Sequence, residues 1–199
     1  MNAKNSYQNL DYENLPNIKK FTACDITQKF NPTGIKEPMI DFVFPEIPFP
    51  PKYFYEELGE EKIRELVFYH HNLMRKSAIG HLFTHEEDKF KIVLDRTADF
   101  FLEALGGGEK YSSKYGHPHL RARHFPFTID EKAREIWLMF FKKALKDLDV
   151  PKKYIKAFWE WLEPMSLRMI NRRTMMELPK RYPFEAIANE FGLGENNEK

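Results

Sequence analysis

The sequence predicts an all-α protein, and three observations support this prediction. Four stretches between residues 52 and 170 repeat their apolar residues at the spacing of one helical face. No stretch of any length alternates apolar and polar residues in the way that a half-buried strand does. The chain has 199 residues, of which 42% are hydrophobic, so it is long enough for one domain with a sizeable core.

Residues 1–50 show neither a helical nor an alternating period. The segment is rich in Asn, Lys and Pro and ends in FPEIPFPP, so we expect an extended arm. We expect this arm to pack on the domain through Phe42, Phe44 and Phe49. Cys24, the only cysteine, also lies in the arm, and one thiol cannot form an internal disulfide.

Two helices are predicted after the arm. The first, at residues 56–75, carries six residues on one face: Ile63, Leu66, Val67, His70, His71 and Met74. The second opens with Thr84 and Glu87, the spacing of a capping box, and ends at the glycines of residues 106–108. Its apolar stripe consists of Phe90, Val93, Leu94, Thr97 and Phe101.

Two further helices complete this part of the chain. The third opens with Thr128 and Glu131, again the spacing of a capping box. Its apolar stripe consists of Ala133, Ile136, Trp137, Phe140, Phe141, Ala144, Leu145 and Leu148. The fourth begins at Pro151, and we expect Pro164 to kink it or end it. The tail is predicted to hold one short helix at residues 183–191.

Residues 106–127 form a long irregular insert between the second and third helices. A loop of about twenty residues inside a compact domain is often functional. Its stretch YGHPHLRARHFPF carries His117, His119 and His124. Their spacing does not suit a tetrahedral zinc site, and no carboxylate or thiol nearby completes the ligand set. A solvated basic loop is the simplest alternative.

Charge and hydropathy exclude two classes of protein. The net charge is +1, whereas proteins that bind nucleic acid usually carry a marked basic excess. No stretch approaches the run of about 18 apolar residues that a membrane-spanning helix needs, and the first residues show no apolar run of signal-peptide length. We therefore expect a cytoplasmic protein that has no membrane span and binds no nucleic acid.

A dense series of short motifs occupies the insert and the third helix. In order, they are Gly106-Gly107, Tyr111-Ser112, Gly116-His117-Pro118, Leu120-Arg121-Ala122-Arg123-His124, Pro126-Phe127 and Trp137. This series closely resembles the truncated haemoglobins, and among them the second group. The resemblance implies a globin-like fold at residues 51–172, a truncated two-over-two sandwich of helices. The N-terminal arm and a C-terminal extension, residues 173–199, have no counterpart in the family pattern.

The resemblance also implies a haem b cofactor. His124 matches the proximal histidine that binds the iron, and a neutral imidazole is a good ligand for haem iron. We expect Arg121 and Arg123 to pair with the haem propionates, because the guanidinium fork suits carboxylates. Tyr111 and His117 are weaker candidates for the same propionates.

On the distal side of the haem, the resemblance assigns four residues. Trp137 matches a pocket tryptophan whose indole N–H donates to iron-bound dioxygen, and Phe83 matches an aromatic residue that stacks on the haem. Counting back from Gly106 places Val93 and Thr97 opposite the iron. Of these two, only Thr97 has a side chain that can form a hydrogen bond with a ligand.

The first helix departs from the family, which places Phe-Tyr where this chain reads FYHHN at residues 68–72. Counting back from Phe83 without a gap puts His70 at the tyrosine position, and we favour this alignment. The helical stripe puts His71 there instead, and a match of the letters puts Tyr69 there at the cost of an inserted residue. A distal histidine makes ligand binding sensitive to pH and can supply a sixth ligand to the iron, although burial in the core explains either histidine equally well.

The resemblance leaves several functions open. The first is binding of a diatomic gas, O2 or else NO or CO, with a reductase as a further partner. The second is a haem enzyme with peroxidase-like or nitric-oxide-consuming turnover, since polar distal groups can assist acid–base steps. A globin with two histidine ligands suits electron transfer or sensing. A module that keeps the fold without haem is the remaining alternative.

Overall fold

The computed structural model describes residues 33–194, and within this range it contains helices and connecting segments but no strand. The four long helices are α2 (Tyr53–Arg75), α3 (Glu87–Ala104), α6 (Glu131–Asp147) and α7 (Lys152–Leu167). The short ones are η1 (Gly80–Leu82), α4 (Ser112–Tyr115), α5 (Leu120–His124), α8 (Phe184–Ile187) and η2 (Ala188–Phe191). The all-α prediction is confirmed. Residues 1–32 of the predicted arm, with Cys24, and residues 195–199 of the predicted tail lie outside the described residues.

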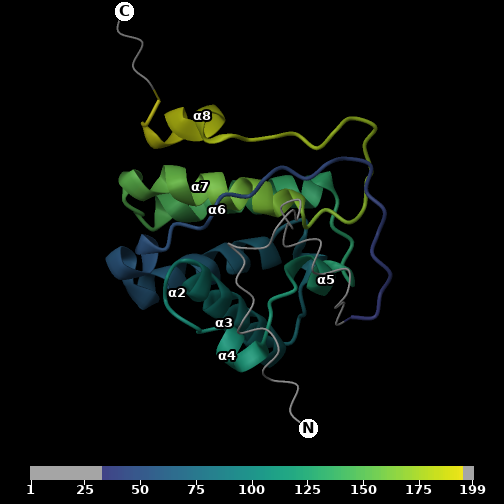
Figure 1. Cartoon of the computed structure of the whole chain (residues 1–199), viewed down its shortest axis with the longest axis horizontal. Helices are drawn as coiled ribbons and strands as arrows, with labels where there is room; N and C mark the ends of the chain where they lie inside the picture. The colour runs from purple at the N-terminus through teal and green to yellow at the C-terminus, as the bar shows by residue number, and fades with distance from the viewer. Residues whose placement is uncertain (1–32, 195–199) are drawn as a thin grey trace, which may run out of the picture.

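The long helices form two layers. In Figure 1, α6 and α7 run side by side in one layer, and α2 and α3 form the layer beneath it. Helix α2 contacts both α3 and α6, so it joins the two layers. Helix α8 covers the outer side of α7. This arrangement is the two-over-two sandwich that the resemblance implies.

An aromatic core fills the space between the layers. The fully buried ring of Phe141 on α6 lies near the rings of Phe101 and Phe158, with centroid distances of 5.7 and 5.9 Å. Phe158 in turn stacks on Phe54 of α2 at 5.3 Å. The described part of the tail belongs to the same core, to which it contributes Phe184, Ile187, Ala188 and Phe191.

Most helices begin close to their predicted positions, but their ends are made differently. Neither of the two predicted capping boxes forms, whether Thr84 with Glu87 at α3 or Thr128 with Glu131 at α6. The Thr84 hydroxyl accepts a hydrogen bond from Glu86, which precedes α3, rather than from a residue inside the helix. Asp130 caps α6, because its carboxylate accepts from the backbone N–H of Ala133 at 2.8 Å. Asp is as good an N-cap residue as Thr and stands directly before the helix.

The structure also differs from the prediction at the end of α7 and at the start of α2. Helix α7 does not end at Pro164 but continues to Leu167. All residues from 161 to 167 are buried, so packing outweighs the backbone hydrogen bond that the proline removes. Helix α2 begins before residue 56 and is interrupted at Gly59, where φ is 77°. Glycine adopts this backbone conformation without steric cost.

The described part of the arm crosses the molecule as an extended segment. Phe42 and Phe44 are half-buried and pack edge to face, with a centroid distance of 5.2 Å. Phe44 also contacts the domain, as predicted, since the guanidinium carbon of Arg121 lies 5.0 Å from its ring centroid. Phe49 is 94% exposed, so the prediction that it packs on the domain is wrong. Within residues 33–194, none of the helices combines the length and the apolar character that crossing a membrane would need.

Candidate functional site

A cavity of about 380 Å³ opens between α3, α5, α6 and the end of α7. Its walls are mainly apolar and aromatic, and they include Phe83, Phe90, Phe100, Phe101, Leu120 and Met165. Volume and lining are typical of a site for a cofactor or a small molecule. Eight of the residues assigned to the haem site line it: Phe83, Val93, Thr97, Tyr111, Arg123, His124, Trp137 and His71, the last being one of the three candidates for the tyrosine position.

His124 ends the short helix α5 and faces this cavity. Its Nδ1 lies 2.6 Å from the carbonyl oxygen of Leu120, so Nδ1 carries the proton and donates it there. Its Nε2 has no partner among the described residues, which leaves a lone pair available to a metal. Burial lowers the pKa of His124 and keeps the ring neutral, which is the form that binds a metal.

Two cationic side chains stand at the edge of the cavity near His124. Arg123 lines the cavity and donates through Nε to the carbonyl of Pro118 at 2.9 Å. Arg96 of α3 also lines it, and its guanidinium lies 4.9 Å from the ring centroid of Tyr115. Neither arginine is paired with a carboxylate in the described part of the chain. The sequence argument missed Arg96, although its position directly before Thr97 gives a signal for it.

Arg121 does not line the cavity, in contrast to the prediction that it pairs with a propionate. Its side chain is 3% exposed, and its Nε donates to Glu37 of the arm at 2.7 Å. Its Nη1 donates to the carbonyls of Arg168 and Ile170. These partners hold the Arg121 guanidinium away from the cavity. Three other arginines line it: Arg134 is paired with Glu163, whereas Arg96 and Arg123 have no carboxylate partner among the described residues.

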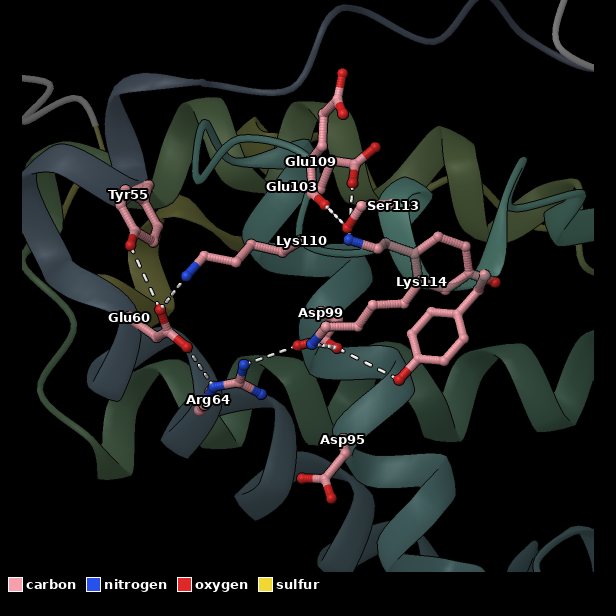
Figure 2. Close-up of polar contacts among 12 residues, drawn as sticks. Tyr55, Glu60, Arg64, Asp95, Asp99, Glu103, Glu109, Lys110, Ser113 and Lys114 are labelled. Carbon is pink, nitrogen blue, oxygen red and sulfur yellow. Dashed lines mark hydrogen bonds and ion pairs between the residues drawn. The ribbon is translucent and has the colours of Figure 1, made fainter. Parts of the chain in front are cut away.

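Tyr111 reaches the cavity from the segment that precedes α4, and a polar network fixes this segment. Figure 2 shows the network between α2, α3 and residues 109–115. Glu103 accepts hydrogen bonds from the backbone N–H groups of Tyr111 and Ser112 at 2.8 and 2.7 Å. These two bonds hold the start of α4, where no side chain of the helix itself provides a cap.

Asp99 is the centre of the same network and is 2% exposed. Its two carboxylate oxygens pair with Arg64 and Lys114, each at 2.7 Å. Arg64 also pairs with Glu60, which in turn binds Lys110 at 2.8 Å. Burial raises the pKa of Asp99, but the two cations beside it outweigh burial and hold that pKa below its usual value.

His117 and His119 lie outside the cavity. Their rings are 4.3 Å apart, and the Nδ1 of His117 accepts a hydrogen bond from the backbone of His119. Within residues 33–194, no group of three or more potential ligands that could hold a metal ion occurs. Because His117 does not line the cavity, the geometry gives no support to it as a propionate partner.

The opposite wall of the cavity comes from α3 and α6. Val93 is 41% exposed at the cavity edge, and the Thr97 hydroxyl donates to the Val93 carbonyl at 2.9 Å. Trp137 lines the cavity, and its indole N–H has no hydrogen-bond partner in the described part of the chain. Trp137 therefore offers a free hydrogen-bond donor at this wall. The Thr97 hydroxyl, in contrast, already donates its proton to a backbone carbonyl of its own helix.

The three candidates in FYHHN occupy three different environments. Tyr69 points away from the cavity and donates to Asp147 at 2.6 Å. His70 is fully buried behind the wall, where it stacks on Phe141 with a centroid distance of 3.6 Å. His71 lines the cavity. The order favoured from the sequence, with His70 ahead of His71, is reversed in the structure.

The two histidines also differ in their hydrogen bonds. His70 has a partner at each ring nitrogen, since Nε2 lies 3.0 Å from the Trp137 carbonyl and Nδ1 lies 3.4 Å from Nδ1 of His71. The Nδ1 of His71 lies 2.8 Å from the Val67 carbonyl, whereas its Nε2 has no partner among the described residues. Burial lowers the pKa of His71 to about 4, and burial together with the neighbouring His71 lowers the pKa of His70 well below its usual value.

Taken together, the cavity can hold a flat apolar group with two carboxylates at one edge and a metal at its centre. The aromatic walls suit the apolar body, and Arg96 with Arg123 suits the carboxylates. His124 supplies a neutral imidazole to the cavity, and His71 and Trp137 add further polar groups to its lining. These residues fit a haem.

Comparisons with known proteins agree with the geometry. The profile of the bacterial-like globin family matches residues 53–171. The curated protein Group 2 truncated hemoglobin YjbI of Bacillus subtilis is 32% identical over 124 residues, which cover 59% of this chain and 88% of that protein.

Solved structures show the same likeness. The crystal structure of phosphate-bound Hell's gate globin IV is 48% identical with a TM-score of 0.74, and the match covers 79% of this chain and 98% of that one. The group II truncated hemoglobin from Bacillus anthracis is 27% identical with a TM-score of 0.54, over 64% of this chain and 100% of that one. The first of these matches extends well beyond the short globin segment of the second.

Proposed function

Because this chain belongs to the bacterial-like globins, the family that includes the group II truncated haemoglobins, we propose that it holds haem b on His124 and binds a diatomic gas. The family implies a haem iron cofactor. His124 would hold the haem iron, and the haem would supply a metal that can bind a gas such as O2, NO or CO. The chain's own residues hold the haem, keep water out and surround the ligand.

The observation that carries this proposal is the state of His124. The residue lies at an apolar cavity with Nδ1 donating to Leu120 and Nε2 unpartnered. Such a backbone partner fixes the tautomer and the ring orientation of a metal-binding histidine. His71 at the same cavity has the same pattern of hydrogen bonds, so the match of His124 to the family motif decides between the two histidines.

On the distal side we assign the ligand-facing roles to Trp137 and His71. Trp137 donates its indole N–H to the bound ligand. His71 is neutral near pH 7 and presents an unprotonated Nε2 while Nδ1 donates to Val67. His71 is therefore an acceptor or a metal ligand in this state rather than a donor.

The experiment that tests the proposal compares His124→Ala with His85→Ala, a substitution at an exposed histidine outside the cavity. Both purified proteins are reconstituted with haem, and their ferric and ferrous absorption spectra are recorded. We expect His85→Ala to show the wild-type Soret band, and His124→Ala to lose that axial spectrum. Retention of the wild-type spectrum in His124→Ala would contradict the assignment.

A second candidate function follows from His71. Its unpartnered Nε2 at the cavity supports a globin with two histidine ligands, suited to redox exchange with a reductase or to sensing. In that case the ferrous protein without gas gives a six-coordinate spectrum, which His71→Leu abolishes and His70→Leu retains. A five-coordinate wild-type spectrum excludes this candidate.

Turnover is tested separately. A peroxidase-like or nitric-oxide-consuming enzyme must exceed the rate of free haem, and its polar distal groups are Trp137 and His71. Steady-state assays with peroxide, and with nitric oxide on the oxygen-bound protein, measure this. Rates equal to those of free haem leave gas binding as the function.

A further inference from the structure

The helix that carries His124 is too short to hold its own shape. Helix α5 has five residues, and isolated helices shorter than about 12–15 residues are marginal in water. His119, directly before it, has a left-handed backbone with φ of 43°, so the helix cannot extend in that direction. The position of His124 therefore depends on contacts from other parts of the chain.

Asn171 holds the C-terminal end of α5. Its side-chain amide donates to the backbone carbonyls of His124 and Phe127, each at 2.8 Å. Its side-chain oxygen accepts from the backbone of Ile129 at 3.0 Å. The carbonyl of the proposed iron ligand is thus tied to the segment that follows α7.

Arg121 holds α5 from a second direction. Its Nη1 donates to the carbonyls of Arg168 and Ile170 at 2.5 and 3.0 Å. Its Nε donates at 2.7 Å to Glu37, which lies in the arm 84 residues earlier in the chain. Among the described residues, Glu37 is the only carboxylate that pairs with Arg121.

Phe44 adds a second contact from the arm. Its ring centroid lies 5.0 Å from the guanidinium carbon of Arg121 and 5.4 Å from that of Arg168. Arg168 also donates to the carbonyl of Pro45 at 3.1 Å. A cation over an aromatic face is attracted more strongly when it is desolvated, and both arginines are buried. The arm thus closes a buried cluster around α5.

We infer that residues 37–45 of the arm position the proximal histidine, with Glu37 and Phe44 acting on it through Arg121. The inference rests on the proposed role of His124 as iron ligand. Arg121 and His124 are three residues apart, within one turn of α5, so a shift of the backbone at Arg121 displaces the backbone at His124. When the arm contacts are lost, the tilt of α5 changes, and the direction of the imidazole toward the iron changes with it.

The first measurement uses the haem-free full chain. Glu37→Ala and Phe44→Ala each remove one arm contact, and we expect backbone hydrogen exchange at residues 120–125 to become about tenfold faster. Phe49→Ala is the matched control, because the same substitution in the same arm removes an exposed ring. Glu37→Gln keeps an oxygen for Arg121 and retains part of the protection. Unchanged exchange in α2 shows that the fold is intact.

The second measurement uses the ferrous haem-loaded protein and records the iron–imidazole stretching band by resonance Raman spectroscopy. We expect the band to shift or broaden in Glu37→Ala and Phe44→Ala and to keep its wild-type position in Phe49→Ala. Loss of the band in His124→Ala tests the proposed function by itself. If that loss occurs while both arm variants keep the wild-type band, the inference is wrong even where exchange is faster, because the arm then only stabilises the fold.

Discussion

The two sides of the cavity are built in different ways. The distal wall consists of α2, α3 and α6, which have 23, 18 and 17 residues. The proximal segment consists of α4 and α5, which have four and five. The long helices bury a continuous apolar face, whereas the short ones are fixed by polar side chains from outside themselves, such as Glu103 at the end of α3 for α4 and Asn171 for α5.

This difference shows which energy term supports each side. Helical stability in proteins comes mostly from the packing of an apolar face, and the distal helices have such a face. The proximal helices lack one, so individual hydrogen bonds and ion pairs decide their positions. We therefore expect substitutions in the distal wall to change global stability, and substitutions around the proximal segment to change local opening.

The largest loss of stability is expected from a substitution of Phe141 in the distal wall. Its side chain is fully buried and contacts the rings of His70, Trp137 and Phe158. Phe141→Ala leaves a cavity among these rings, and we expect it to lower the free energy of unfolding by about 3–5 kcal/mol. Urea denaturation of the haem-free protein measures this change.

Met139→Ala is the control for this substitution, since Met139 lies on the same helix and is 48% exposed. We expect it to change the free energy of unfolding by no more than about 0.5 kcal/mol. A loss below about 1 kcal/mol in Phe141→Ala would mean that the distal wall does not depend on its core packing.

A smaller effect is expected from the protonation of His71. Its pKa is about 4 in the folded chain, against an ordinary value of about 6.5, so acid favours the unfolded state. The stability that this histidine provides is complete above about pH 6.5 and falls as the pH drops toward 4, by about 1.4 kcal/mol per pH unit. The His71→Leu variant has no imidazole to protonate at this position, so it does not show this loss of stability.

The measurement is urea denaturation of the haem-free protein at several pH values. Between about pH 6.5 and 4.5 we expect the wild type to lose roughly 2–3 kcal/mol more than His71→Leu. This range lies above the acidic region in which Asp99, whose pKa is lowered, begins to contribute. Equal slopes in the two proteins would show that His71 is not buried in the neutral form.

The same difference between the two sides explains what could be predicted from the sequence. The long helices were predicted to within a few residues, because their apolar faces repeat at the helical period. The caps of the helices were not predicted correctly. The cap of α6, for example, is Asp130 rather than Thr128 two residues before it. Helix α7 continues beyond Pro164 because the residues around the proline are buried, and a local sequence pattern does not show such burial.

At the site, eight of the residues singled out from the sequence and the family resemblance line the cavity, and Arg121 and His70 are among those that do not. His70 and His71 share one apolar stripe, but His70 packs against Phe141 in the core while His71 lines the cavity, and the stripe alone does not distinguish two adjacent positions. Arg121 and Arg123 stand two residues apart in one motif. The partner that turns Arg121 away, Glu37, lies far off in the sequence, where no pattern connects the two.

The smallest effect is expected at Lys114 in the network of Figure 2, on the proximal side. Its ammonium is half-exposed and pairs with the buried Asp99, so Lys114→Met removes one of two ion pairs on that carboxylate. We expect a local loss of about 0.5–1 kcal/mol, seen as hydrogen exchange in α4 that is two- to fivefold faster. Lys91→Met, which breaks an ion pair with Asp95 inside α3, is the matched control and leaves α4 unchanged. Because salt screens exposed charges, the effect of Lys114→Met shrinks at about 1 M salt. An effect of equal size at low and high salt would mean that the lysine holds α4 by packing rather than by charge.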